Sequence, residues 1–217
     1  MAGAMIARTK AALHLRAVPD GDAAPASERS VGDEEIISGL VAGEEWAAEV
    51  LYDRVHRVVD RTLRRLLRAS EFDYEDLLQI TFERIIRTLL ERRFRGACNL
   101  STWAGAIASR VAIDAFRSKL RARSVFDGRQ PADDDLAAGR NLEREIEARS
   151  EVEQLQSVLA AMDPRQAESV VLHDLFGHEL SEIAVLTGVS VAAAQSRLAR
   201  GRKDLLRRVE IRRRSGR

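Results

Sequence analysis

Apolar residues repeat with the spacing of an α-helix in every segment of this chain that has a regular pattern. From Asp33 to Leu67 they recur every three or four positions, and the same spacing returns after Asp73, after Leu100 and after Val152. Alternation of apolar and polar residues, which is typical of strands, competes nowhere along the sequence. We therefore predict an all-α fold.

Two stretches without this spacing divide the chain. Residues 1–32 are rich in Ala, Gly, Pro and Asp, and we interpret them as a flexible N-terminal extension. Residues 124–146 contain Gly, Pro and an acidic run, which predicts a flexible acidic linker. The expected architecture is two small helical domains, residues 33–123 and 147–217.

Capping residues predict where the helices begin. Asp73 is the expected N-cap of one helix, and Ser101 or Thr102 that of the next. In the second domain Pro164, directly after an aspartate, stops one helix and starts another.

The segment from Ile183 to Lys203 has the pattern of a helix-turn-helix. Ala184 is small enough for two helices to cross closely, Gly188 can adopt the positive φ of a tight turn, and Ser190 can cap the second helix. The residues expected to point inward are Ile183, Val189, Ala194 and Leu198. From residue 197 to the C-terminus ten basic residues stand against two acidic ones, which favours binding to phosphates.

Composition excludes several other classes of protein. The 35 basic and 34 acidic residues nearly cancel, but they segregate along the chain. Cys98 has no partner for a disulfide, and the four histidines form no metal-ligand pattern with it. No apolar run reaches the length of a membrane span, so we expect a cytoplasmic protein without membrane insertion. Without a catalytic constellation, we expect no enzyme activity, cofactor, metal or small-molecule substrate.

Several of these stretches resemble the extracytoplasmic-function (ECF, group IV) sigma factors of the sigma-70 family. The stretches similar to their region 2 are residues 73–82, 102–103, 107–108 and 112–114, and those similar to region 4 are residues 159–166 and 196–200. The resemblance covers residues 34–123 and 147–210, in the family's order and with no region 3 between them. It implies a region 2 helical bundle followed by a region 4 helix-turn-helix.

The resemblance assigns the polymerase contact to the helix after Asp73. Asp76 and Gln79, with Phe82 one turn further on, would dock on the clamp helices of the largest subunit of core RNA polymerase. The polymerase flap is a further partner that the family implies. Ile80 stands where the family usually has an acidic residue, and an altered clamp contact is expected there.

Recognition of the −10 element is assigned to the loop from Phe94 to Leu100 and to the helix after it. In the family this loop captures an unstacked base, a role that Asn99 would take here. The expected −10 contacts are Arg95, Asn99, Arg110, Arg117, Lys119 and Arg121. Ser109-Arg110 stands where the family commonly has Arg-Asn, so the charge is displaced by about 100° around the helix.

Recognition of the −35 element is assigned to the second helix of the helix-turn-helix, which would enter the major groove. The expected contacts are Ser190, Ala193, Gln195, Ser196, Arg197, Arg200 and Lys203. Ala193 and Gln195 replace a threonine and a lysine of the family. Gln195 can pair bidentately with adenine, which predicts a sequence preference particular to this chain.

The resemblance implies a transcription initiation factor that binds core RNA polymerase, directs it to −35/−10 promoters and aids −10 melting. An anti-sigma factor is an expected further partner. Two alternatives remain open at this point. One is a conventional helix-turn-helix regulator that binds operator DNA, and the other is a degenerate sigma factor that only titrates an anti-sigma factor.

Overall fold

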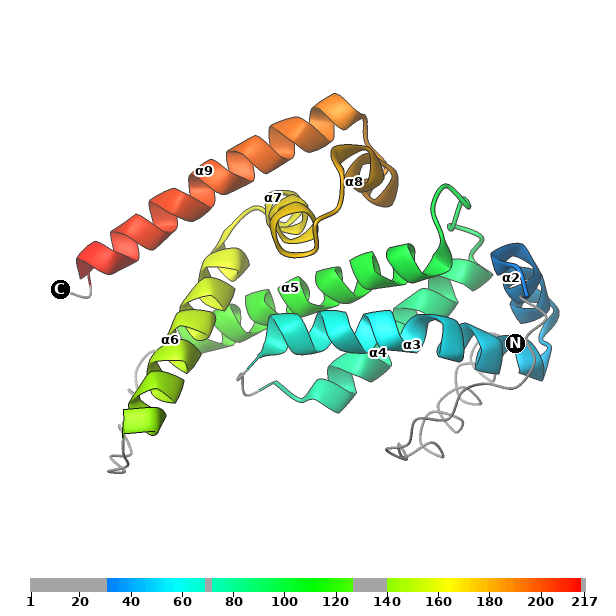
Figure 1. The fold of residues 1–217 in the computed structure, drawn as a ribbon, viewed down its shortest axis with the longest axis horizontal. Helices are drawn as coiled ribbons and strands as arrows, with labels where there is room; N and C mark the ends of the chain where they lie inside the picture. Colours follow the sequence, from blue (N-terminus) through cyan, green and yellow to red (C-terminus); the bar gives the residue numbers. More distant parts are fainter. Residues whose placement is uncertain (1–30, 69–71, 127–139, 216–217) are drawn as a thin grey trace. The chain divides into compact units, whose positions relative to one another are not determined.

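The computed structural model describes residues 31–68, 72–126 and 140–215, and every regular element in these ranges is a helix (Figure 1). The all-α prediction is therefore confirmed. The N-terminal extension up to residue 30 and residues 127–139 of the expected linker lie outside the described residues. Within the described residues, no helix is both long and apolar enough to cross a membrane.

The helices form two compact units, and α3 (Glu45–Leu67) and α5 (Leu100–Phe126) contribute residues to both. The first unit lies within Met1–Arg61 and Glu75–Ala108. The second lies within Thr62–Tyr74 and Ser109–Arg217. Because these units cut across two helices, the domain boundaries expected from the sequence stay predictions.

The first unit packs α2 (Asp33–Ala42) and α4 (Tyr74–Leu90) with parts of α3 and α5. Its core consists of buried apolar side chains, among them Ile36, Leu40, Leu51, Val55, Ile85, Leu89 and Leu100. Asp33 connects three of these helices. Its Oδ1 accepts from Arg54 Nη1 at 2.8 Å, and its Oδ2 accepts from the Leu100 backbone N–H at 2.8 Å. The start of α5 is thereby held to α2 and α3.

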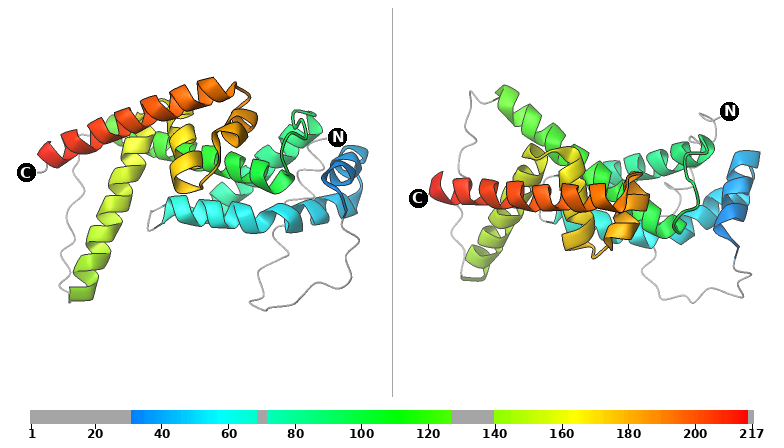
Figure 2. Two further views of the ribbon diagram at one scale, coloured as in Figure 1. Left: turned by 45° about the horizontal axis from the view of Figure 1, so that its top comes forward. Right: turned by 90° about the horizontal axis from the view of Figure 1, so that it is seen from above.

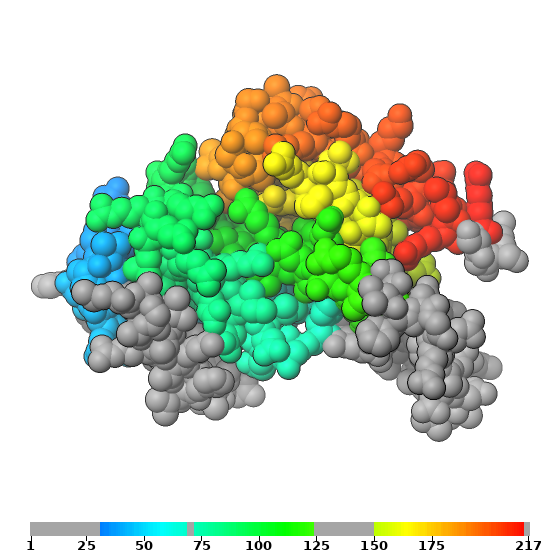
Figure 3. Space-filling model, turned by 180° about the vertical axis from the view of Figure 1, so that it is seen from behind, coloured from blue at the N-terminus to red at the C-terminus, as the bar shows by residue number. Residues whose placement is uncertain are grey.

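The second unit contains α6 (Arg140–Ala161), α7 (Pro164–Val170), a π-helical turn η1 (Val171–Leu175), α8 (Leu180–Thr187) and α9 (Val191–Ser215). Asp163 caps α7 by accepting from two backbone N–H groups, and Pro164 is the first residue of that helix. α9 crosses α7 and α8 (Figure 2). The space-filling view shows the yellow atoms of the end of α6 and of α7 lying against the orange-to-red part of the chain that includes α9 (Figure 3).

A glycine permits the close crossing of α7 and α9. A Cβ added at Gly201 would lie 2.8 Å from Val170 Cγ2 and 2.9 Å from the carbonyl oxygen of Gln166. Real Cβ atoms do not approach so closely, so only glycine fits here without displacement of α7.

The helices extend into the expected linker from both sides. α5 ends at Phe126 and α6 begins at Arg140, whereas the sequence analysis placed a linker at residues 124–146. Leu155, an apolar residue of the helical pattern that returns after Val152, is 46% exposed.

Candidate nucleic-acid interface

The expected polymerase-binding residues of α4 lie on different faces of that helix. Asp76 is exposed, and Gln79 is half-buried with its Nε2 donating to Glu83 Oε1 at 3.1 Å. Phe82 is only 1% exposed and stacks on Tyr52 with ring centroids 5.0 Å apart. The expectation that Phe82 contacts the polymerase directly is therefore wrong, because its ring belongs to the core of the first unit.

Ile80 completes the exposed face around Asp76. It is 39% exposed and lies four positions after Asp76, which places both residues on the same side of α4. In the sequence, Ile80 stands out only as a departure from the family pattern. Its position marks it as the apolar residue next to the carboxylate, where Phe82 had been expected.

The loop before α5 contains two residues in the left-handed backbone region, Arg92 with φ 54° and Gly96 with φ 67°. Arg95 is exposed. Asn99 is exposed too, but its Oδ1 accepts from the backbone N–H of Thr102 at 2.7 Å. Asn99 is thus the N-cap of α5, and the expected caps Ser101 and Thr102 are wrong. The expected base contact of Asn99 would have to use the Nδ2 amino group of its side-chain amide.

Two of the expected −10 arginines bind groups of the second unit. The Arg110 Nε donates to Glu168 Oε1, and its Nη2 donates to the carbonyl oxygen of Leu186 at 2.7 Å. The Arg117 Nη1 donates to the carbonyl oxygen of Met162 at 2.9 Å. Both guanidinium groups were expected to contact DNA, and no pattern in the sequence indicates these contacts.

Glu168 is an acidic residue in a buried position of α7. Burial raises the pKa of its carboxyl group above the ordinary value, and the nearby Arg110 guanidinium opposes this shift. Ion pairing with Arg110 is what makes a carboxylate tolerable in this place.

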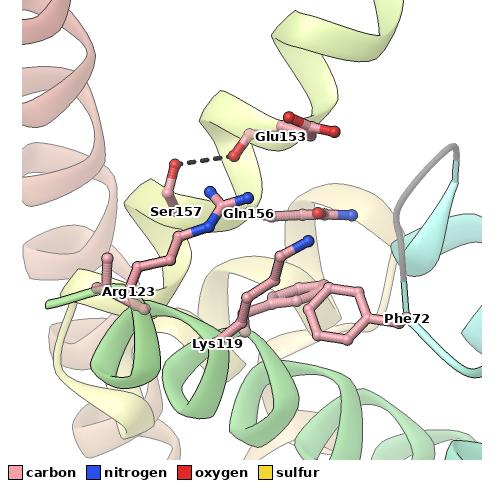
Figure 4. A pocket seen from close by; sticks show the side chains of 8 residues that line it. Phe72, Lys119, Arg123, Glu153, Gln156 and Ser157 are labelled. Carbon is pink, nitrogen blue, oxygen red and sulfur yellow. Dashed lines mark hydrogen bonds between the residues drawn. The ribbon is translucent and has the colours of Figure 1, made fainter. Parts of the chain in front are cut away.

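The last basic residues of α5 border a hollow against α6 (Figure 4). The Lys119 ammonium lies over the Phe72 ring, 4.9 Å from its centroid, and Phe72 in turn packs on Phe116. Across the hollow, Gln156 donates to the carbonyl oxygen of Leu66 at 2.8 Å. Lys119 is therefore partly committed to packing, while Arg121 is exposed.

The helix-turn-helix expected from the sequence is present as α8 and α9. Gly188 ends α8 with φ 66°, and the Ser190 Oγ accepts from the Ala193 backbone N–H at 3.2 Å at the start of α9. α8 begins with a reciprocal cap between Glu179 and Glu182. The buried side chains of the motif include Ile183, Ala184, Ala194 and Leu198, whereas Val189 is half-buried.

The face of α9 opposite its buried residues is basic. Ser196, Arg200 and Lys203 are exposed and fall on one side of the helix, with Arg207 and Arg214 in the same stripe further along. Gln195 and Ser190 are also exposed, while Ala193 and Arg197 are half-buried. The −35 residues expected from the sequence thus lie at or beside an accessible basic surface.

An ion pair and a hydrogen bond hold α9 in place on the side away from this stripe. Arg202 bonds the carboxylate of Asp174 in η1, with its Nε 3.0 Å from Oδ2. Hydrogen bonding to Arg202 lowers the pKa of Asp174 below its ordinary value. Near the C-terminus Arg212 Nη1 donates to the Ser157 Oγ of α6 at 2.6 Å. Arg212 is therefore a packing residue as well as part of the basic tail.

Within the part of the chain that the structure describes, no group of three or more His, Cys, Asp or Glu side chains is arranged to hold a metal ion.

Two segments of the chain match descriptions of known families. Residues 51–122 match "Sigma-70 region 2", and residues 152–205 match "Sigma-70, region 4". The first match contains the helix with Asp76, and the second contains α8, the turn and α9 as far as residue 205.

Proteins that are similar to this chain over most of its length are also named as RNA polymerase sigma factors. The chain is 29% identical over 181 residues to the ECF RNA polymerase sigma factor SigM of Mycobacterium tuberculosis, covering 83% of this chain and 85% of SigM. It is 29% identical over 163 residues to the RNA polymerase sigma factor CarQ of Myxococcus xanthus, covering 75% and 89%. A structure of CnrH in complex with the cytosolic domain of CnrY matches with a TM-score of 0.47 and 21% identity, covering 82% of this chain and 97% of CnrH.

Proposed function

Because the chain belongs to the sigma-70 family as an ECF-type sigma factor, we propose that it binds core RNA polymerase and directs it to promoters with −35 and −10 elements. The observation that carries this proposal is the capped helix-turn-helix with a basic outer face on α9, in a chain that also matches region 2. A second proposed activity is assistance in opening the −10 region.

The proposed −35 contact uses the N-terminal half of α9. A helix enters the major groove with its first turns toward base edges, and backbone N–H groups at its N-terminus favour phosphate. Gln195 would read a base, while Arg200 and Lys203 would contact phosphates on either side. The exposure of all three residues supports this division.

The proposed polymerase contact uses the exposed face of α4 with Asp76 and Ile80, and with Gln79 at its border. A carboxylate and an amide can pair with basic and polar groups of the clamp helices, and Ile80 can bury apolar area beside them. This assignment replaces Phe82 by Ile80.

The proposed −10 contact uses Arg95 and Asn99 in the loop before α5 and the basic residues along α5. An anti-sigma factor that masks these DNA surfaces is the proposed regulatory partner. Its chemistry would have to complement the basic faces of α5 and α9.

In vitro transcription with purified core RNA polymerase tests the proposal, with a library of DNA fragments carrying randomised −35 and −10 elements as template. We expect specific start sites only when the chain is present. The double variant Asp76→Ala with Gln79→Ala should weaken core binding while leaving helical content unchanged, and Glu151→Ala serves as an exposed control.

The alternatives give different results in this experiment. A conventional regulator would bind DNA without being retained by core polymerase in a pull-down. A degenerate sigma factor that only titrates an anti-sigma factor would give no specific start site on any fragment of the library.

A further inference from the structure

Two basic side chains of α5 are bound by groups in α7, in α8 and in the residue pair just before α7. Arg110 uses two different nitrogens, one for the Glu168 carboxylate and one for the Leu186 carbonyl oxygen. Arg117, about two helical turns further along α5, binds the carbonyl oxygen of Met162. All five residues belong to the second unit.

These contacts use the same donors that a nucleic acid would need. Guanidinium groups bind carboxylates and phosphates in the same geometry, through parallel N–H donors. The Glu168 side chain is only 11% exposed, whereas that of Arg110 is 37% exposed, so the carboxylate is closed to solvent while part of the arginine side chain remains accessible. A DNA phosphate could not reach Arg110 Nε while the Glu168 oxygen occupies it.

We propose that Glu168 and the carbonyl groups of Met162 and Leu186 form an autoinhibitory latch, which keeps Arg110 and Arg117 from DNA until α7 and α8 leave α5. The inference rests on the proposed function, since it assumes that both arginines contact the −10 element. Glu168 then takes the place of a phosphate in the free protein.

Simultaneous binding of the −35 and −10 elements would pull the two sides of the latch apart. The −35 and −10 elements are centred roughly 25 base pairs apart, about 85 Å along B-DNA. α7 and α8 pack against α9, so they would move with it to the −35 element and could not stay at α5. Opening also returns the buried Glu168 carboxylate to water, which offsets part of the lost pairing.

The affinity of the full chain for a fluorescein-labelled, single-stranded oligo-dT of twenty nucleotides tests whether Arg110 and Arg117 are released from the latch. This test needs no known promoter sequence. Glu168→Gln should bind at least threefold more tightly than the unaltered full chain. The slope of log affinity against log salt should steepen by about 0.7 for each arginine that gains a phosphate. Glu151→Gln, with the same change of charge at an exposed site of α6, should change affinity less than twofold and leave the slope unaltered.

Glu168→Asp is the second variant, because it keeps the net charge and withdraws the carboxylate from Arg110. A gain in affinity from this variant cannot come from overall charge. If Glu168→Gln does not fold, as judged by helical circular dichroism, Glu168→Asp decides the question.

A distance measurement without DNA separates the latch from the proposed function. Spin labels at Ser118→Cys and Val185→Cys, in a Cys98→Ser background, should give one narrow distance distribution that broadens in Glu168→Gln and Glu168→Asp. An unchanged distribution overturns the latch, whatever the DNA result. A broadened distribution without tighter DNA binding shows that the contact opens but that Arg110 and Arg117 do not bind DNA, which overturns the inference through the proposed −10 role.

Discussion

At the scale of single residues, Asn99 combines a structural and a proposed functional role. Its Oδ1 caps α5, and the same side chain is the proposed reader of a −10 base. Asn99→Ala should lower the free energy of unfolding by about 1 kcal/mol, since it removes the cap. Urea denaturation followed by circular dichroism measures this loss.

Asn99→Ser is the control that separates the two roles. Serine caps helices nearly as well as asparagine, so stability should stay close to that of the unaltered chain. The amide is gone, so a preference for one −10 base should disappear. Retained preference in Asn99→Ser would show that Asn99 only caps the helix.

Phe82 gives a prediction of the opposite kind. Because its ring is buried and stacked on Tyr52, Phe82→Ala should lower the free energy of unfolding by about 3 to 5 kcal/mol. Asp76→Ala should cost far less, as expected for an exposed side chain. Denaturation of both variants makes the comparison, and equal losses would contradict the placement of Phe82 in the core.

The sequence contained enough information to place Phe82 correctly. Six positions at 100° each put Phe82 about 120° away from Asp76 around the helix, and Ile80 at four positions lies close to it. The family pattern joined Asp76, Gln79 and Phe82 in one contact, but helical geometry separates them. The cap at Asn99 was harder to foresee, because asparagine, serine and threonine are all good caps and three of them, Asn99, Ser101 and Thr102, stand within four positions.

At the scale of helices, Gly201 sets how closely α7 and α9 approach. Gly201→Ala should lower the free energy of unfolding by about 1 to 3 kcal/mol, because the new methyl group collides with Val170 and the Gln166 carbonyl. In an uncrowded helix the same change would instead stabilise by about 1 kcal/mol. The sign of the change in a thermal or urea denaturation therefore decides whether the crossing is as tight as described.

The two ends of α9 have different proposed roles. Gln195 near its start would read a base, and Arg213 and Arg214 near its end would attract phosphates. Gln195→Ala should relax preference at one −35 position and cost about 1 to 3 kcal/mol there. The pair Arg213→Gln with Arg214→Gln should weaken binding alike for all sequences and flatten the salt dependence by about 0.9 per lost phosphate contact. Arg212 is left unaltered, since it also binds Ser157.

Binding of the full chain with core polymerase to a −35 library, at several salt concentrations, compares these variants. A changed base preference in the arginine pair, with an unchanged preference in Gln195→Ala, would reverse the assignment.

Local signals predicted the starts of α4, α7 and α9. Gly188 and Ser190 mark the turn before α9, and α4 begins one residue after Asp73, because caps and positive φ depend on nearby residues alone. The start of α6 at Arg140 was missed, since acidic and small residues there satisfied the pattern of a linker. The π-helical turn η1 also has no signature in the spacing used.

At the scale of the whole molecule, the paired carboxyl groups of Asp174 and Glu168 make the stability of the fold depend on pH. The pKa of Asp174 is lowered mainly by its hydrogen bond from Arg202, so its pairing stabilises the fold above the unfolded pKa and is lost as pH falls. Between about pH 5 and pH 3 the unaltered chain should lose more stability than Asp174→Asn. Urea midpoints across this range measure the difference, with Glu151→Gln as control, and parallel curves would contradict it.

Glu168 acts in the opposite sense. Its pKa is raised by burial, so its protonated form is favoured in the folded state, and stability falls as pH rises from the unfolded pKa through the folded one. Contacts of this kind join residues 58 positions apart, as in Arg110 and Glu168. No local pattern in a single sequence encodes such a pairing, which is why the sequence analysis assigned Arg110 to DNA alone.

α9 is one unbroken helix of 25 residues, which makes it about 37 Å long. A turn of B-DNA rises about 34 Å, and over that distance the major groove winds once around the duplex. A rod of this length cannot follow the winding, so when its first turns lie in a groove its far end leaves that groove across the sugar-phosphate backbone. Arg213 and Arg214 then stand where the helix leaves the groove, a position from which they can attract phosphates of any sequence but cannot reach a base edge.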